Sequence, residues 1–155
     1  MQNYIKSQTR LAFIQYIFQS EFTNFKSLDS IDDFQNYFYN LNISSIGQKK
    51  EFKLKFNKSY LKKLFLNYIK NFNNENIINK INKYFKLQRK FESWNGVLKS
   101  LIYAIVSELE IAEEKKIKII FNDYINISKS LISSKETKLF NAIIQKYLDE
   151  KIKSK

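Results

Sequence analysis

Apolar residues recur three or four positions apart along almost the whole chain, which is the spacing of amphipathic helices. The pattern predicts a first helix over residues 3–22, with an apolar surface wide enough for a central, mostly buried position. One face of this helix carries Leu11, Ile14, Phe18 and Phe22, with Phe13 and Ile17 beside them. Further helices are expected, in chain order, over residues 30–42, 58–72, 75–87, 95–109 and 115–131, followed by a last helix.

The start of the last helix carries the clearest local signal. Ser133 and Glu136 stand three positions apart, ahead of an apolar stripe, which is the spacing of a capping box. In that motif the hydroxyl accepts a bond from the third amide, and the carboxylate reaches back toward the serine. We therefore expect a helix that begins directly after Ser133.

One short segment departs from the helical pattern. Residues 52–56 alternate between large apolar side chains and lysine, which is typical of a strand. No second strand is evident, so the segment is interpreted as an extended lead-in to the next helix or as its start. Residues 44–48 are expected to form a loop. The prediction is a single domain over residues 1–155 with an all-α fold of about seven helices.

The composition argues against an enzyme. The 155 residues contain no cysteine, which excludes disulfides, thiolate nucleophiles and cysteine-ligated zinc. They contain no histidine, the usual acid–base group near neutral pH and the commonest metal ligand. Gly47 and Gly96 are the only glycines, so a glycine-rich phosphate loop is absent. We expect no catalytic residues, no metal and no cofactor.

One group of carboxylates leaves two interpretations open. It could form a metal site or an acid–base pair, since several of its members can share a helix face. It could equally be a solvated helix end, balanced by the lysines that follow it, and this second interpretation is favoured. The group consists of Glu108, Glu110, Glu113 and Glu114.

The positive charge is concentrated in one part of the chain. Residues 49–90 contain thirteen lysines or arginines and two acids, a balance of +11 out of a net charge of +12. A basic face on a small helical domain is typical of a protein that binds a polyanion such as nucleic acid. Aromatic side chains within the stretch could stack on unpaired bases, and for Tyr60 and Tyr84 this is open, whereas Phe65 and Phe72 are expected in the core.

The positive charge could also arise from a compositional bias or serve a membrane. A bias toward lysine should act along the whole chain, whereas the charge is clustered. A membrane surface could attract a basic helix, but the apolar faces of these helices are needed for the core. No apolar run approaches the roughly 20 residues of a membrane span, and residues 1–10 lack the apolar core of a secretory signal. The cytoplasm is the expected compartment, with no membrane partner.

Several strings, in the same order, resemble the NusB family of transcription antitermination factors. The first helix carries RLAFIQYIFQ over residues 10–19, similar to the family pattern R-x-x-A-x-Q-A-L-Y. Residues 97–103, VLKSLIY, resemble I-L-R-x-A-x-Y-E-L, with Ala104 in place of the glutamate. Residues 121–131 begin with FND and resemble I-N-E-x-x-x-x-A-K-x-F, and KLFNAII over 138–144 resembles K-F-V-N-G-V-L. An insertion of about four residues near 108–114 keeps this register.

The resemblance implies a fold and a function. The family fold has two packed three-helix bundles, here an N-terminal bundle of about residues 1–72 and a C-terminal bundle of about 74–155. Family members pair with the ribosomal protein NusE, bind single-stranded boxA RNA and load onto the transcribing RNA polymerase. The implied function is transcription antitermination, notably in ribosomal RNA operons. The alternatives are a general helical RNA-binding module without a NusE partner, and an interaction protein whose lysines are only solvated.

The resemblance also implies site residues. RNA would lie across the start of the first helix and the start of the last helix, where lysine and arginine would neutralise phosphates and Phe18 would offer a stacking face. NusE would dock on the second bundle. The RNA-binding residues expected on this basis are Lys6, Arg10, Phe18, Lys135, Lys138 and Leu139. The partner-binding residues are Trp94, Leu98 and Tyr103.

Overall fold

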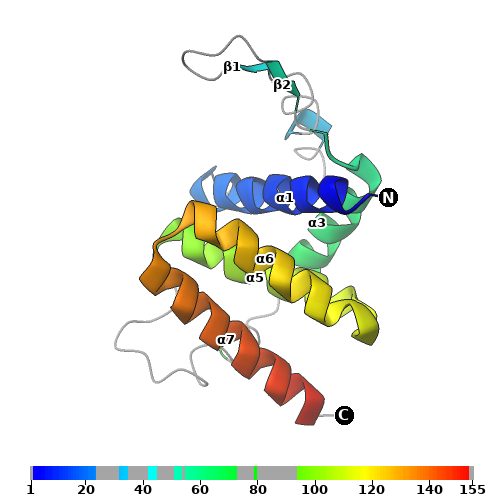
Figure 1. Ribbon diagram of the computed structural model, residues 1–155. Helices are drawn as coiled ribbons and strands as arrows, with labels where there is room; N and C mark the ends of the chain where they lie inside the picture. Colours follow the sequence, from blue (N-terminus) through cyan, green and yellow to red (C-terminus); the bar gives the residue numbers. More distant parts are fainter. Residues whose placement is uncertain are drawn as a thin grey trace.

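The computed structural model describes residues 2–23, 32–34, 42–44, 51–53, 55–72, 79 and 94–153. Their elements are shown in Figure 1 and follow in chain order: helix α1 (Asn3–Thr23), strands β1 (Asn42–Ser44) and β2 (Glu51–Lys53), helix α3 (Lys58–Phe72), helix α5 (Gly96–Ile111), a 3₁₀ turn (Glu114–Lys116), helix α6 (Ile117–Leu131) and helix α7 (Ser134–Lys153). Residues 32–34 and 79 are also helical. The all-α prediction is confirmed, with five long helices in the described part of the chain where about seven were expected overall.

Helix α5 is the central element. Every residue from Ser100 to Leu109 is buried, so the helix is covered on all sides rather than along one stripe. Helices α1, α3, α6 and α7 all pack against it. The sequence pattern predicts a central, mostly buried position for α1, which does pack against α3, α5 and α6. It did not reveal that α5 is covered on more sides, because α5 also buries polar residues that a hydrophobic pattern does not count, namely Ser100, Ser107 and Glu108.

Helix α1 buries a face next to the one expected. Phe13 and Ile17 are completely buried, whereas Leu11 and Phe18 are half-buried at the flanks. The apolar arc of α1 is wide, so the sequence does not fix its centre. Contacts with α3, α5 and α6 decide which residues point inward.

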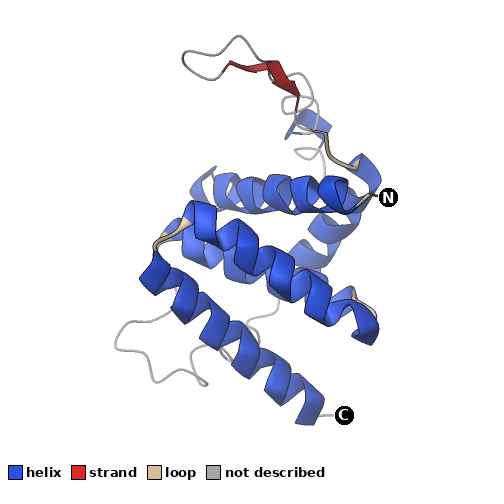
Figure 2. Ribbon diagram, in the orientation of Figure 1, coloured by secondary structure: helices blue, strands red, loops and turns tan. Residues whose placement is uncertain are grey.

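The strand-like segment has a partner after all. Strands β1 and β2 pair antiparallel, with Ile43 opposite Phe52, and Figure 2 shows them away from the packed helices. The expected helix over 30–42 is observed at residues 32–34, whereas Asn42 and Ser44 belong to a strand rather than to a helix and a loop. Three residues are too few to reveal β1 by periodicity, because strand alternation needs about four or more positions. Residues 55–57 lead into α3 without regular secondary structure.

Local signals set two helix starts. The side chain of Asn95 accepts a bond from the amide of Val97 (2.8 Å) at the start of α5. The predicted capping box is confirmed at α7: the amide of Glu136 donates to Ser133 Oγ (3.2 Å), and the amide of Ser133 donates to Glu136 Oε1 (3.4 Å). Both motifs satisfy amides that a helix leaves without an internal partner.

One hydrophobic cluster runs through the helices, from Phe13 of α1 and Leu64 of α3 to Ile144 of α7. The division into two bundles at residues 72–74 stays a prediction, since residues 73–78 lie outside the described part of the chain. The predicted helix over 75–87 lies outside it as well, except for residue 79. Among the described helices, none is both long and apolar enough to cross a membrane.

Candidate nucleic-acid interface

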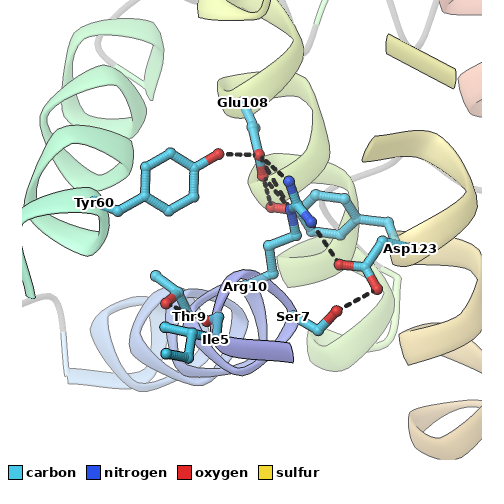
Figure 3. Close-up of polar contacts among 8 residues, drawn as sticks. Ile5, Ser7, Thr9, Arg10, Tyr60, Glu108 and Asp123 are labelled. Atoms are coloured by element: carbon cyan, nitrogen blue, oxygen red, sulfur yellow. Dashed lines mark hydrogen bonds and ion pairs between the residues drawn. The ribbon is translucent and has the colours of Figure 1, made fainter. Parts of the chain in front are cut away.

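Arg10 lies inside the protein, at the place where four helices meet. Its side chain is in the core face of α1, and the residue is only 4% exposed. The guanidinium donates three hydrogen bonds to Glu108 of α5: Nε to Oε1 (3.1 Å), Nε to Oε2 (3.0 Å) and Nη2 to Oε1 (2.8 Å). On its other side, Nη1 donates to Asp123 Oδ2 of α6 (2.6 Å), as Figure 3 shows.

Neutral donors complete this buried group. The hydroxyl of Tyr124 donates to Glu108 Oε2 (2.9 Å), and the hydroxyl of Tyr60 on α3 donates to Glu108 Oε1. Ser7 Oγ donates to Asp123 Oδ1 (2.7 Å). The aromatic ring of Tyr124 lies against the guanidinium, 5.9 Å from its centre to Arg10 Cζ. We call Ser7, Arg10, Tyr60, Glu108, Asp123 and Tyr124 the buried junction.

The junction joins helices α1, α3, α5 and α6. A buried charge is tolerated only where it is paired and hydrogen-bonded. Burial by itself lowers the pKa of Arg10, but the hydrogen bonds and attraction of Glu108, with the bond to Asp123, raise it above its ordinary value on balance. Burial, followed by the charge of Glu108, raises the pKa of both Tyr60 and Tyr124 above the usual range. Arginine and tyrosines therefore stay protonated at neutral pH.

This geometry corrects the role expected for Arg10. The guanidinium was predicted to neutralise RNA phosphates, but it has two carboxylate partners inside the protein and almost no exposed surface. A phosphate could reach it only if those ion pairs were broken. Arg10 therefore belongs to the core and not to a surface that RNA can reach.

Glu108 also bears on the register of the resemblance. In the alignment based on residues 97–103, the buried Ala104 takes the place of the family glutamate. That alignment also needs about four extra residues near 108–114. Glu108 follows Ala104 by four positions, about one helical turn, on the same side of α5. Moving the register by that turn would align Ser107, Glu108 and Leu109 with Y-E-L and remove the insertion.

The starts of α1 and α3 are tied together beside the junction. The amide of Asn57 donates to Thr9 Oγ1 (3.0 Å), and Thr9 Oγ1 itself donates to the carbonyl of Ile5 (2.7 Å). The side chain of Asn57 caps α3 by accepting a bond from the amide of Tyr60 (2.8 Å). Lys6 precedes Thr9 by three residues, so both lie on one face of α1. Lys6 therefore lies close to the first turn of α3.

The remaining residues expected to bind RNA do not share one site with Lys6. Lys135 and Lys138 are exposed in the first turns of α7, and Leu139 is half-buried against the core. From Asp123, which touches Arg10, α6 runs eight residues, about 12 Å, to Leu131 before the chain turns into α7. Figure 1 accordingly shows the start of α1 and the start of α7 at opposite ends of the molecule. Phe18 lies half-buried, two turns beyond Arg10 in α1.

The residues expected to contact a partner are mostly internal. Leu98 and Tyr103 of α5 are 3% and 8% exposed, and the Tyr103 ring packs against Tyr68 at 6.0 Å between ring centres. Trp94, directly before α5, is half-buried and packs against the same core. Of the three, only Trp94 retains a substantial exposed part.

The group of glutamates is divided by the fold. Glu108 points into the junction, whereas Glu110 is exposed and accepts a bond from the hydroxyl of Tyr147. Glu113 forms exposed ion pairs with Lys115 (3.1 Å) and Lys116 (3.8 Å). Within the described ranges no three acidic side chains gather as a metal site. The solvated interpretation therefore holds for the exposed members and fails for Glu108.

Sequence reasoning missed two kinds of residue. The carboxylate partners of Arg10 are one, although Arg10 stands three, four and seven positions before Phe13, Ile14 and Ile17, in phase with the buried face. Tyr4 is the other: it is 63% exposed in the first turn of α1. The open question about Tyr60 is answered, since its hydroxyl belongs to the junction, whereas Tyr84 lies outside the described residues.

Comparison with known proteins agrees with this helical architecture. The model of the NusB family matches residues 7–149. This range includes all the long helices except the first residues of α1 and the last residues of α7. The transcription antitermination protein NusB of Rickettsia typhi is 26% identical over 145 residues, covering 94% of this chain and 92% of that protein. No solved structure matches the chain significantly. Because the family model spans nearly the whole chain, the protein belongs to the NusB family.

Proposed function

We propose that this protein acts in transcription antitermination, as a non-catalytic helical protein that binds RNA. The observation that carries the proposal is the family match over residues 7–149, together with a relative that is named as an antitermination protein. The charge supports it, since a net charge of +12 favours a polyanionic partner. The lack of cysteine and histidine leaves few groups for catalysis at neutral pH.

The RNA would be a single strand of the boxA type, bound together with NusE. Lysines contribute to such binding by neutralising phosphates, and unpaired bases supply the sequence choice. Lys6 at the start of α1 is one contact, and Tyr4 in the same turn offers an exposed ring for stacking. Lys135, Lys138 and Leu139 would form a second contact at the start of α7, with Phe18 of α1 as a further apolar surface.

The partner NusE would dock on the C-terminal helices, near Trp94. The buried positions of Leu98 and Tyr103 favour a supporting role for them beneath that surface rather than direct contact. The pair of proteins would then load onto the transcribing RNA polymerase. In this arrangement the protein changes no covalent bond and works by holding RNA and NusE together.

Titration of boxA RNA and of a scrambled RNA, each with and without NusE, tests this function. We expect NusE to raise the affinity for boxA RNA sharply and to leave the scrambled RNA nearly unchanged. If NusE has no effect while both RNAs bind, the chain is a general helical RNA-binding module. If neither RNA binds under any of these conditions, RNA binding itself is rejected and the interaction-protein alternative stands.

A paired variant tests the proposed contact residues. Lys6→Glu with Lys138→Glu should weaken boxA binding, whereas Lys129→Glu with Lys153→Glu, which changes the charge equally at exposed positions, should have a smaller effect. Arg10→Glu is unsuitable as a test, since it would place a third carboxylate in the junction. Equal losses for the two pairs would mean that only total charge matters.

A further inference from the structure

We infer that the exposed lysine face of α3, joined to Lys6 of α1, is a surface that binds the phosphate backbone of single-stranded RNA. This inference rests on the proposed function and assigns the general basic character of residues 49–90 to one defined surface within the described part of that stretch. We define the α3 lysine face as Lys55, Lys58, Lys62, Lys63 and Lys70.

The face has a regular geometry. All five lysines are exposed, and Lys58, Lys62 and Lys70 follow one another at multiples of four residues along the helix. The span from Lys58 to Lys70 is about 18 Å, at about 1.5 Å per residue. A strand that follows the helix can therefore meet several positive charges in succession.

The opposite face of α3 holds these lysines in place. Leu61, Leu64, Phe65 and Tyr68 are fully buried in the core. The hydroxyl of Tyr60 and the capped amide at Asn57 fix the first turn of α3 to the junction and to α1. A membrane-bound amphipathic helix inserts its apolar face into the lipid bilayer. The apolar face of α3 is already covered by protein, so α3 cannot bind a membrane in this way.

The face continues onto α1. Thr9 is bonded to Asn57, and Lys6 stands one turn before Thr9, while Lys55 and Lys58 flank Asn57 in sequence. These three lysines therefore gather where the two helices begin. A strand that meets Lys6 can pass directly onto α3, without the long path to the start of α7.

The charge of this surface is not balanced by its own sequence. Residues 55–72 contain five lysines and no aspartate or glutamate. The segment before α6 differs in sequence, because it contains Glu113 and Glu114 beside Lys115 and Lys116. Lysine acts as a point charge toward phosphate and carries little base information. The α3 lysine face should therefore add affinity that does not depend on RNA sequence.

Neutralising variants test the inference. Lys62→Gln, Lys63→Gln and Lys70→Gln together remove three charges from α3, and Lys118→Gln, Lys129→Gln and Lys153→Gln remove three from exposed sites on α6 and α7. Binding of single-stranded boxA RNA and scrambled RNA is measured by fluorescence anisotropy over a range of salt concentrations. At low salt we expect the α3 variant to bind both RNAs at least tenfold more weakly than the unmodified protein does. Its slope of log affinity against log salt should fall in magnitude by about 2, at about 0.7 per phosphate.

Each outcome separates this inference from the proposed function. If the unmodified protein binds boxA RNA and the two triple variants lose affinity and slope equally, the α3 face has no special role and only the inference is overturned. If the α3 variant loses binding to anionic lipid vesicles and keeps its RNA binding, the surface serves a membrane and the inference is again overturned. If the unmodified protein binds no RNA, both fail. Circular dichroism of each variant confirms that it is folded.

Discussion

The buried junction and the α3 lysine face adjoin each other at Asn57, yet they use positive charge in opposite ways. In the junction, Arg10 meets Glu108 and Asp123 and is shielded from water. The α3 lysine face has five exposed lysines, over a stretch of residues 55–72 that has no acidic residue of its own. Whether a cation stabilises the fold or can bind a ligand therefore depends on its exposure to solvent.

The energetic reason is the cost of removing charge from water. A buried ion loses several kcal/mol of hydration, which only close partners can offset, so the loss of one partner is severe. An exposed lysine stays hydrated and contributes at most about 1 kcal/mol to folding. Changes in the junction should therefore alter stability, and changes on the α3 face should alter binding.

The largest effect should come from Arg10→Met. This change leaves Glu108 buried without its cation, and we expect the free energy of unfolding to fall by about 3–5 kcal/mol, measured by urea denaturation. Lys62→Met on α3 is the matched control and should stay within about 0.5 kcal/mol. If Arg10→Met were as stable as the control and bound RNA poorly, Arg10 would be a ligand-binding residue, and the contrast between the two regions would be lost.

A smaller effect is expected for Tyr4→Ala, in the first turn of α1. The exposed ring should stack on a base, and its loss should weaken RNA binding by about 1–3 kcal/mol, measured by the same anisotropy titration. Stability should change little, since the side chain is 63% exposed. Tyr4→Phe keeps the ring and should retain most of the affinity. Equal losses in the two variants would attribute the contact to the hydroxyl instead.

Ser133→Ala should cost about 1 kcal/mol of folding stability, because the amide of Glu136 loses its acceptor. Thermal unfolding measures the change, with Ser134→Ala as the control in the neighbouring position. RNA binding at low temperature should persist if α7 still folds. If Ser133→Ala left the folding stability unchanged, the packing of α7, rather than its cap, would fix where the helix begins.

The last prediction concerns the tyrosines of the buried junction. Their ionisation should change the folding stability in alkaline solution and have almost no effect at neutral pH. Burial and the charge of Glu108 raise the pKa of Tyr124 in the folded protein. Above pH about 10, unfolded tyrosines lose their protons while folded Tyr124 keeps its own. The folded state then binds more protons, so stability falls as pH rises. Urea denaturation at several pH values should show this fall, and Tyr124→Phe should make it shallower; an unchanged slope would argue against the buried hydroxyl.

Much of the fold could be predicted from local pattern. The expected helix over 58–72 coincides with α3, Lys58–Phe72, and the start of α7 follows from two residues of a capping box. These features depend on residues three or four positions apart, which the sequence displays directly. Strand β1 could not be found in this way, since its three residues are recognised only through pairing with β2.

The candidate site was less accessible to such reasoning. The sequence indicated a basic surface and a family resemblance, and it placed Lys6 and Arg10 together as RNA contacts. The sequence could not show that Arg10 is paired inside the protein, because the carboxylate that it contacts lies 98 positions away along the chain. The exposed Tyr4 and the half-buried Tyr60 could not be distinguished by composition either.

The helical class, most helix boundaries and the concentration of lysine between residues 49 and 90 can be deduced from the chain alone, since they depend on neighbouring residues. The burial of Arg10, the central position of α5 and the continuity of the α3 lysine face with Lys6 come from the packing of the helices. The physical reason is that burial and ion pairing are set by contacts between distant segments, and hydration of a charge changes with burial far more than with its neighbours in sequence.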